Sequence, residues 1–284
     1  MKSEGSLNAG RQAALDLGSS RTRVIVPSGG VIVDQPSRLG GAPVTGRRSG
    51  RRSEGDVNGR WPIRHGVVAD ASGCTRLTRR VLGDIATGIL TGTATGTEAV
   101  RSAEAPDGTG LDEVLLGVPV TATPSQRNVA AVAVEAATGC PVTVMEAPLA
   151  AAIGSGLDVA GPRPRLIMDI GAGVVEIVVI AHGRILGARA IQYEPQHSAG
   201  RPRPHIPDHV LQQMADVVHR VIGDLPSGTR PAVRRGGLVL TGGGARTASL
   251  PGRLTTDMRL MVSVAPDPAW ATVRGLARMC ARPA

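Results

Sequence analysis

The sequence predicts an α/β fold in which two similar lobes face one another. Three turns that follow apolar strands support this prediction, at residues 16–22, 169–176 and 240–245. The first two turns each have an aspartate at the end of a strand, a glycine two residues later and a further apolar strand. The third contains three consecutive glycines. A repeated strand–turn–strand pattern followed by a glycine-rich loop predicts two lobes around a nucleotide cleft.

The first half of the chain is predicted to be a strand meander followed by alternating helices and strands. Three apolar runs between residues 13 and 33 are separated by turns that contain glycine and serine, which is typical of antiparallel strands. Residues 38–60 and 91–110 lack apolar periodicity, so we expect exposed loops there. The other expected elements, from the spacing of apolar residues, are a helix over 71–90, a strand over 114–120, a helix over 125–138 and a strand over 142–145.

The second half repeats this pattern. A second meander is expected over 166–190, and it contains the turn at 169–176. Residues 193–207 are rich in proline, glycine and histidine, which predicts an irregular segment. The remaining expected elements are a helix over 147–157, an amphipathic helix over 208–222, a strand over 237–241 and a closing helix over 269–279.

The composition indicates a globular protein with an aliphatic core. Hydrophobic residues make up 42% of the 284 residues, yet there is no phenylalanine, one tyrosine and only two tryptophans. The three cysteines are far apart, so they give neither a paired metal-ligand spacing nor a disulfide framework. No segment approaches the roughly 18 apolar residues of a membrane span, and residues 1–11 lack an apolar core. We therefore expect a cytoplasmic protein.

The net charge raises the question of an anionic partner. The formal net charge is +9, and it comes almost entirely from arginine because Lys2 is the single lysine. Aromatic residues do not interleave with the arginines, and no zinc-finger or RNP spacing occurs, so no nucleic-acid partner is expected. Codon bias explains the arginine excess instead. The arginines of residues 38–60 would allow peripheral contact with anionic lipid, at about 1 kcal/mol per cation.

The turns carry groups that suit a phosphate and a metal ion. Backbone N–H groups and the hydroxyls of Ser19 and Ser20 can donate hydrogen bonds to an anion. Glycines in the second turn let the backbone approach a phosphate closely. Asp16 and Asp169 would repel phosphate, so we expect them to bind a water-shelled Mg²⁺ between themselves and the phosphates.

Several runs of the sequence resemble the MreB/Mbl rod-shape proteins, which are bacterial relatives of actin. The most distinctive run is EAPLAAAIGSGLD at residues 146–158, followed shortly by Asp169-Ile170-Gly171. The resemblance implies the actin-like ATPase fold, in which two ribonuclease-H-like lobes surround a nucleotide cleft. The other similar runs are residues 14–26, 62–70, 117–119, 168–180 and 237–250.

The resemblance also implies a set of site residues for ATP and Mg²⁺. Asp16 and Asp169 would bind Mg²⁺ through water. Gln126 stands where MreB proteins place the glutamate that positions the attacking water, and a glutamine can orient water but is a poor base. The nucleotide-binding residues would be Gly18, Ser19, Ser20 and Arg21 in the first turn, Gly171, Ala172 and Gly173 in the second, and Gly242, Gly243, Gly244 and Ala245 beside the adenosine.

The chain departs from the family pattern in its outer subdomains. Only 45 residues lie between Ile191 and Gly237, where MreB proteins carry a whole subdomain. We therefore expect subdomain IIB, with its ribose-binding helix, to be largely missing, and subdomain IB, at about 38–61, to be reduced. The expected division is a first lobe of residues 1–145 plus 266–284 and a second lobe of residues 146–265.

The function implied by the resemblance is that of an ATP-binding cytoskeletal protein in cell shape or cell-wall morphogenesis. The implied partners are further copies of the chain, full-length MreB/Mbl filaments and the cell-wall synthesis machinery. A weak Mg²⁺-dependent ATPase and a non-catalytic regulatory protein with the actin fold both stay open. So does a compact DnaK-type chaperone or reactivation factor, whereas a sugar or acetate kinase would need a substrate-binding insert for which the chain has no room.

Overall fold

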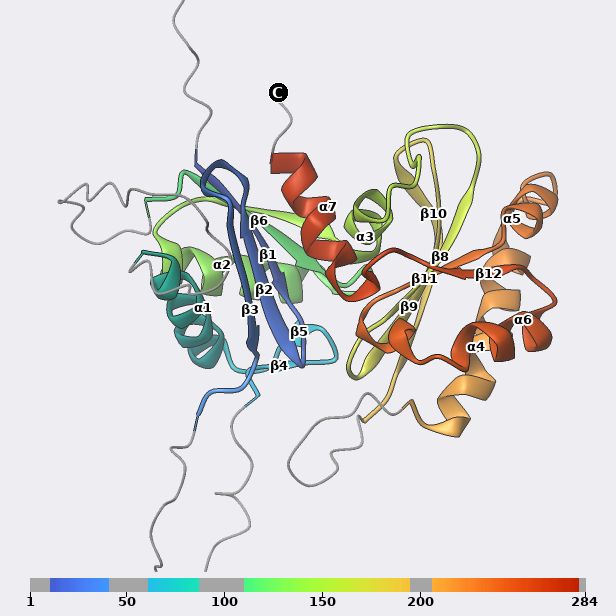
Figure 1. The fold of residues 1–284 in the computed structure, drawn as a ribbon, viewed down its shortest axis with the longest axis horizontal. Coiled ribbons are helices and arrows are strands. Elements are labelled where there is room, and N and C mark those ends of the chain that lie inside the picture. Colours follow the sequence, from blue (N-terminus) through green and yellow to red (C-terminus); the bar gives the residue numbers. More distant parts are fainter. Residues whose placement is uncertain (1–10, 41–60, 87–109, 195–205, 281–284) are drawn as a thin grey trace, which may run out of the picture.

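Two five-stranded sheets stand next to one another, with helices between them and on their outer faces (Figure 1). This computed structural model describes residues 11–40, 61–86, 110–194 and 206–280. The first sheet has the order β3 (Val31–Pro36), β2 (Arg21–Val26), β1 (Gln12–Leu17), β6 (Glu113–Val118), β7 (Val142–Glu146). The second has the order β10 (Arg184–Gln192), β9 (Val174–Ala181), β8 (Arg165–Ile170), β11 (Leu238–Thr241), β12 (Val262–Val264).

The two sheets share one topology. In each, the three meander strands pair antiparallel. A fourth strand then pairs parallel with the first strand of the meander, and a fifth pairs parallel with the fourth. The parallel strands follow helical connections, as parallel pairing requires. This repetition is what the matching turns in the sequence predicted.

The outer face of the first sheet packs against α1 (Ala71–Ala86) and α2 (Pro124–Thr138). Successive side chains of a strand point to opposite faces. On β1, Leu15 is fully buried in the same core as Leu77 of α1 and Val134 of α2. Its neighbour Ala14 faces the other way and packs against α7 (Ala271–Cys280). The sheet is therefore covered on both faces.

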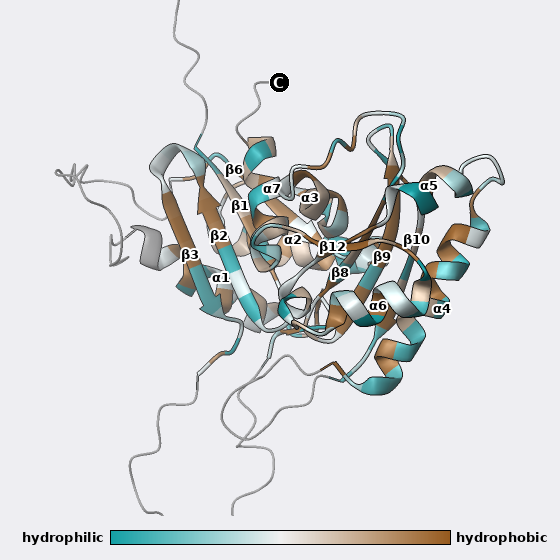
Figure 2. Cartoon of the chain, turned by 45° about the vertical axis from the view of Figure 1, so that its right-hand side comes forward, coloured by the Kyte–Doolittle hydropathy of each residue, from teal (hydrophilic) through white to brown (hydrophobic). Residues whose placement is uncertain are grey.

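The second sheet is covered in the same way. Its outer face packs against the amphipathic α4 (Asp208–Asp224), α5 (Arg230–Gly236) and α6 (Leu250–Met258). Its inner face packs against α3 (Ala147–Gly154), where Ile167 and Val178 share a core with Ala152 of that helix. All eight residues of β9 are buried. Figure 2 shows hydrophobic residues running along the strands, with hydrophilic residues on the exposed parts of the helices.

Helices α3 and α7 lie between the two sheets and cross with their backbones in contact (Figure 1). A Cβ atom added to Gly275 of α7 would lie 1.7 Å from the carbonyl oxygen of Ala150, and one added to Gly154 of α3 would lie 1.8 Å from that of Ala271. No side chain fits at either position. These two glycines therefore allow the helices to join the two halves of the molecule closely.

Most predicted elements are present, and the described residues also form four features that were not predicted. Three are α5, α6 and β12, and the fourth is a short hairpin of β4 (Ile63–Arg64) and β5 (Val67–Val68). The sequence predicted one helix between the strands β10 and β11, whereas the described residues of that stretch form α4 and α5 and contain no strand. The loops predicted at 38–60, 91–110 and 193–207 fall largely outside the described residues. No helix in the described ranges is long and apolar enough to cross a membrane.

Candidate nucleotide site

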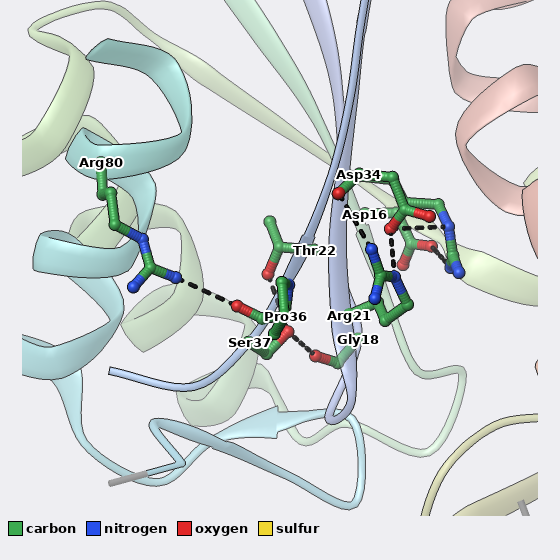
Figure 3. A network of polar contacts seen from close by, with 9 residues as sticks. Asp16, Gly18, Arg21, Thr22, Asp34, Pro36, Ser37 and Arg80 are labelled. Carbon is green, nitrogen blue, oxygen red and sulfur yellow. Dashed lines mark hydrogen bonds and ion pairs between the residues drawn. The ribbon is translucent and has the colours of Figure 1, made fainter. Parts of the chain in front are cut away.

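The first glycine turn is closed by backbone and hydroxyl hydrogen bonds at the end of β1. Gly18 N donates to the carbonyl oxygen of Arg21 at 3.1 Å, and a Cβ atom on Gly18 would lie 2.7 Å from that oxygen. The Ser37 hydroxyl donates to the Gly18 carbonyl at 2.6 Å and is 2.9 Å from the Thr22 hydroxyl (Figure 3). The turn therefore requires a glycine at position 18. Ser37, the residue after β3, holds it in place together with Thr22 of β2.

The second turn has the same design at the end of β8. Gly171 N donates to Val174 O at 2.9 Å, which matches the bond that closes the first turn. The Tyr193 hydroxyl donates to Gly171 O at 2.6 Å, and Tyr193 N donates to Gly173 O at 3.0 Å. Tyr193, the single tyrosine of the chain, was not predicted as a site residue. Its two hydrogen bonds hold the carbonyl groups of Gly171 and Gly173 in place.

The β4–β5 hairpin connects the two turns. Gly66 N donates to the Ser19 hydroxyl oxygen at 2.9 Å, so the hydrogen of that hydroxyl remains available for an anion. His65 Nδ1 donates to the carbonyl oxygen of Gly173 at 2.8 Å, and its Nε2 lies 3.3 Å from Glu194. The backbone at Gly66 has a φ of +77°, and a Cβ atom there would lie 2.6 Å from Pro119. Nothing in the local pattern of residues 62–68 predicted that this hairpin would reach both turns.

Asp16 and Asp169 come close enough to affect one another. The pKa of Asp169 is raised to about 6, chiefly by burial and then by repulsion from Asp16, against the lowering effects of Thr241 and Arg23. Burial likewise raises the pKa of Asp16 to about 6, against the lowering effect of Arg23. The structure thus brings both predicted carboxylates together. In the described ranges, no three His, Cys, Asp or Glu side chains gather as a metal site.

Two arginines of β2 contact Asp34, and one of them, Arg23, also lies beside Asp16. Arg21 Nε lies 2.5 Å from Asp34 Oδ1, and its Nη2 donates to the Asp34 carbonyl at 2.9 Å (Figure 3). Its guanidinium is therefore paired with β3, although Arg21 was predicted to hold phosphate. Arg23 is opposite Asp16 in the β1–β2 register, and its Nη1 lies 3.8 Å from Asp16 Oδ2.

A third carboxyl group, that of Glu176, was not predicted as a site residue. Its side chain is buried, and Oε1 accepts a hydrogen bond from Val120 N at 2.7 Å. Burial and then repulsion by Asp169, which is opposite Glu176 in the β8–β9 register, raise its pKa to about 8. Glu176 therefore joins the second sheet to the loop that precedes α2. The signal in the sequence was that Glu176 follows the second turn at a position where its strand can pair with Asp169.

Gln126, the predicted water-positioning residue, caps helix α2. The Thr123 hydroxyl accepts from Gln126 N at 3.3 Å, and the Gln126 side-chain oxygen accepts from Thr123 N at 2.9 Å. This reciprocal pair is a capping box, which satisfies two free N–H groups at the start of the helix. The side chain is exposed, and its amide nitrogen is the group left to contact a ligand. The catalytic role of Gln126 stays a prediction.

The triglycine loop packs against the end of β8 beside Asp169. A Cβ atom on Gly242 would lie 2.4 Å from Asp169 Oδ1, and one on Gly244 would lie 2.3 Å from Ile170 Cγ2. A Cβ atom on Gly243 would meet nothing within 4 Å. Gly242 N donates to Pro268 O at 2.8 Å. Two of the three glycines are thus required by packing, and the loop borders the predicted Mg²⁺ carboxylate.

Known proteins share this sequence pattern and fold. The family described as "MreB/Mbl protein" matches residues 10–196. The cell shape-determining protein MreB of Escherichia coli K12 is 24% identical over 192 residues, which cover 63% of this chain and 50% of that protein. The chain therefore spans about half the length of the curated relatives it matches.

Solved structures show the fold. MreB5 of Spiroplasma citri bound to AMPPNP aligns with a TM-score of 0.73 and 17% identity, over 95% of this chain and 96% of that one. A MamK double helical filament aligns with a TM-score of 0.69 and 16% identity, over 96% of this chain and 100% of that one. The actin-like fold expected from the sequence is confirmed.

Proposed function

The chain belongs to the MreB/Mbl family, and on this premise we propose that it is an ATP-binding cytoskeletal protein that takes part in determining cell shape. The observation that carries the proposal is the pairing of the two glycine turns, with Asp16 and Asp169 close enough for their charges to interact. Backbone N–H groups of both turns and the Ser19 hydroxyl are the donors for phosphate. The adenosine would lie beside the loop formed by Gly242, Gly243, Gly244 and Ala245. MreB5 of Spiroplasma citri, which has this fold, was crystallised with AMPPNP and with ADP.

Mg²⁺ belongs to this proposal because the residues present suit it. A hydrated Mg²⁺ needs only one or two carboxylates, and it neutralises phosphate charge when it binds. Asp16 and Asp169 are the carboxylates that would hold it. Burial raises the pKa of both carboxyl groups to about 6, and a cation between them would favour their charged forms.

Self-association follows from the same proposal. The chain forms filaments or joins those of full-length MreB/Mbl proteins, in contact with the cell-wall synthesis machinery and at most peripherally with the cell membrane. The MamK filament supports this part, since its subunit has the same fold. Sedimentation of the purified chain, alone and with full-length MreB, in the presence and absence of ATP tests it. Absence of this chain from the pellet under all four conditions would contradict filament formation.

A non-catalytic role is the second candidate, and two observations favour it. The Gln126 carbamoyl oxygen is engaged in the helix cap. In addition, the described residues between β10 and β11 form only helices, where family members carry a ribose-binding subdomain. A phosphate-release assay separates the candidates. A slow release that disappears in Gln126→Ala supports the ATPase, and no release by a chain that binds ADP supports the regulatory role.

A further inference from the structure

Arg23 has an unusual place in the repeated topology. It lies opposite Asp16 in the register of β1 and β2, and in the second sheet Glu176 lies opposite Asp169 in the same way. The two equivalent positions therefore carry opposite charges. Arg23 is also opposite Asp34 on β3. It brings a fixed positive charge to a part of the cleft that is otherwise acidic.

Packing, rather than short hydrogen bonds, holds the Arg23 side chain in place. Its guanidinium carbon lies 5.4 Å from the centre of the Trp270 ring, and only 12% of the side chain is exposed. Its distances to Asp16 and Asp34 are 3.8 and 3.5 Å, which exceed the roughly 2.7–2.9 Å of a charge-assisted hydrogen bond. Among the described residues, Arg23 Nε has no hydrogen-bond partner. Nε is too buried to reach an anion, whereas the contact of Nη1 with Asp16 is long, so the two Nη groups keep donor capacity for an anion.

The Arg23 side chain also lies close to the triglycine loop through its contact with Trp270. Trp270, on which the guanidinium rests, ends the short turn η3 (Pro268–Trp270), and Pro268 O accepts from Gly242 N of the triglycine loop. Arg23 therefore lies where the first turn, the second sheet and the triglycine loop converge.

We propose that Arg23 contacts the phosphates of a bound nucleotide and offsets the charge of Asp16, so that nucleotide binding depends only weakly on Mg²⁺. The proposal rests on the nucleotide site proposed above and adds a residue to it. In a site with two carboxylates and no fixed cation, a polyphosphate would need a divalent ion to enter. Here the chain provides a cation of its own at that place.

The test is ADP binding to the full chain by calorimetry, once with excess Mg²⁺ and once with EDTA. For the wild type we expect the Kd to change by less than about tenfold between the two conditions. Arg23→Gln should weaken binding by about 10- to 100-fold in EDTA, the range of a charge-assisted hydrogen bond, and by less with Mg²⁺. Arg23→Lys should recover part of the loss. Arg189→Gln is the matched control, because Arg189 forms an exposed ion pair with Asp224 of α4 and its side chain makes no hydrogen bond or ion pair with the described residues of either turn.

Each outcome decides the proposal. Loss of ADP binding by the wild type in EDTA, with binding in Mg²⁺, overturns the role of Arg23 and leaves the proposed nucleotide site intact. Equal Kd values for Arg23→Gln and Arg189→Gln in EDTA overturn it as well. Absence of ADP binding by the wild type in both conditions overturns the nucleotide site and this inference together. Should Arg23→Gln not fold, the Kd values of the wild type and of Arg23→Lys for ADP, in EDTA and in Mg²⁺, still decide whether Arg23 has this role.

Discussion

Replacement of Gly275 by alanine should destabilise the molecule at the crossing of α3 and α7. The added Cβ atom would lie 1.7 Å from the carbonyl oxygen of Ala150. A carbon–oxygen contact is normally no shorter than about 3.3 Å, so the helices must separate by roughly 1.5 Å. Overpacking of this kind costs about 1–3 kcal/mol, occasionally more. Alanine returns up to about 1 kcal/mol of helix propensity.

The net effect expected for Gly275→Ala is therefore a loss of about 1–2 kcal/mol in the free energy of unfolding, measured by urea titration followed by circular dichroism. Gly252→Ala is the matched control, because Gly252 lies in α6 and a Cβ atom there meets nothing within 4 Å. That variant should be neutral or more stable. If Gly275→Ala proves as stable as Gly252→Ala, the close crossing does not exist as described. Because the crossing lies between the sheets, ADP affinity should also fall in Gly275→Ala alone.

Three further predictions concern the site. Gly66→Ala should cost about 1–3 kcal/mol in thermal unfolding, since a Cβ atom would lie 2.6 Å from Pro119 at a φ of +77°; an unchanged melting temperature contradicts the hairpin packing. The pKa of Glu176 is about 8 when folded against an ordinary 4.5, so the folded state binds the proton more tightly and stability should fall as pH rises from 4.5 to 8. Glu176→Gln should flatten this pH dependence of the urea midpoint, and an unchanged slope refutes it. Asp169→Asn should weaken the Mg²⁺-dependent part of ADP binding, whereas equal calorimetric Kd values with Mg²⁺ would argue against a metal at Asp169.

Local sequence signals were sufficient wherever backbone chemistry forces a structure. The spacing of Asp16 and Gly18 and its repeat at Asp169 and Gly171 predicted two strand-end turns, and the turns are closed by equivalent backbone hydrogen bonds. The hydrophobic face of residues 208–222 predicted α4 to within two residues of its end. The predicted boundary between the two lobes stays a prediction, although each sheet is built from the expected segments.

Local signals failed where a contact joins residues that are distant in the sequence. The hairpin β4–β5 has only two residues per strand, and its role comes from bonds to Ser19 and Gly173 that no local pattern encodes. Arg21 and Arg23 look alike in the sequence. In the structure, Arg21 forms the short ion pair with Asp34, whereas Arg23 packs on Trp270. For Gln126, the capping box with Thr123 was readable as a Thr-x-x-Gln spacing, but it was not recognised.

The sequence by itself determined the repeated meander, the glycines of both turns and the membership of the chain in its family, because these depend on residues close together or on ordered motifs. Only the tertiary structure decided which charges meet in the cleft. Asp16, Arg23, Asp169 and Glu176 come from two sheets, and the pKa shifts of the three carboxyl groups arise from burial and from the charges around them. Electrostatic energy depends on separation and local dielectric, and neither is defined until the lobes pack.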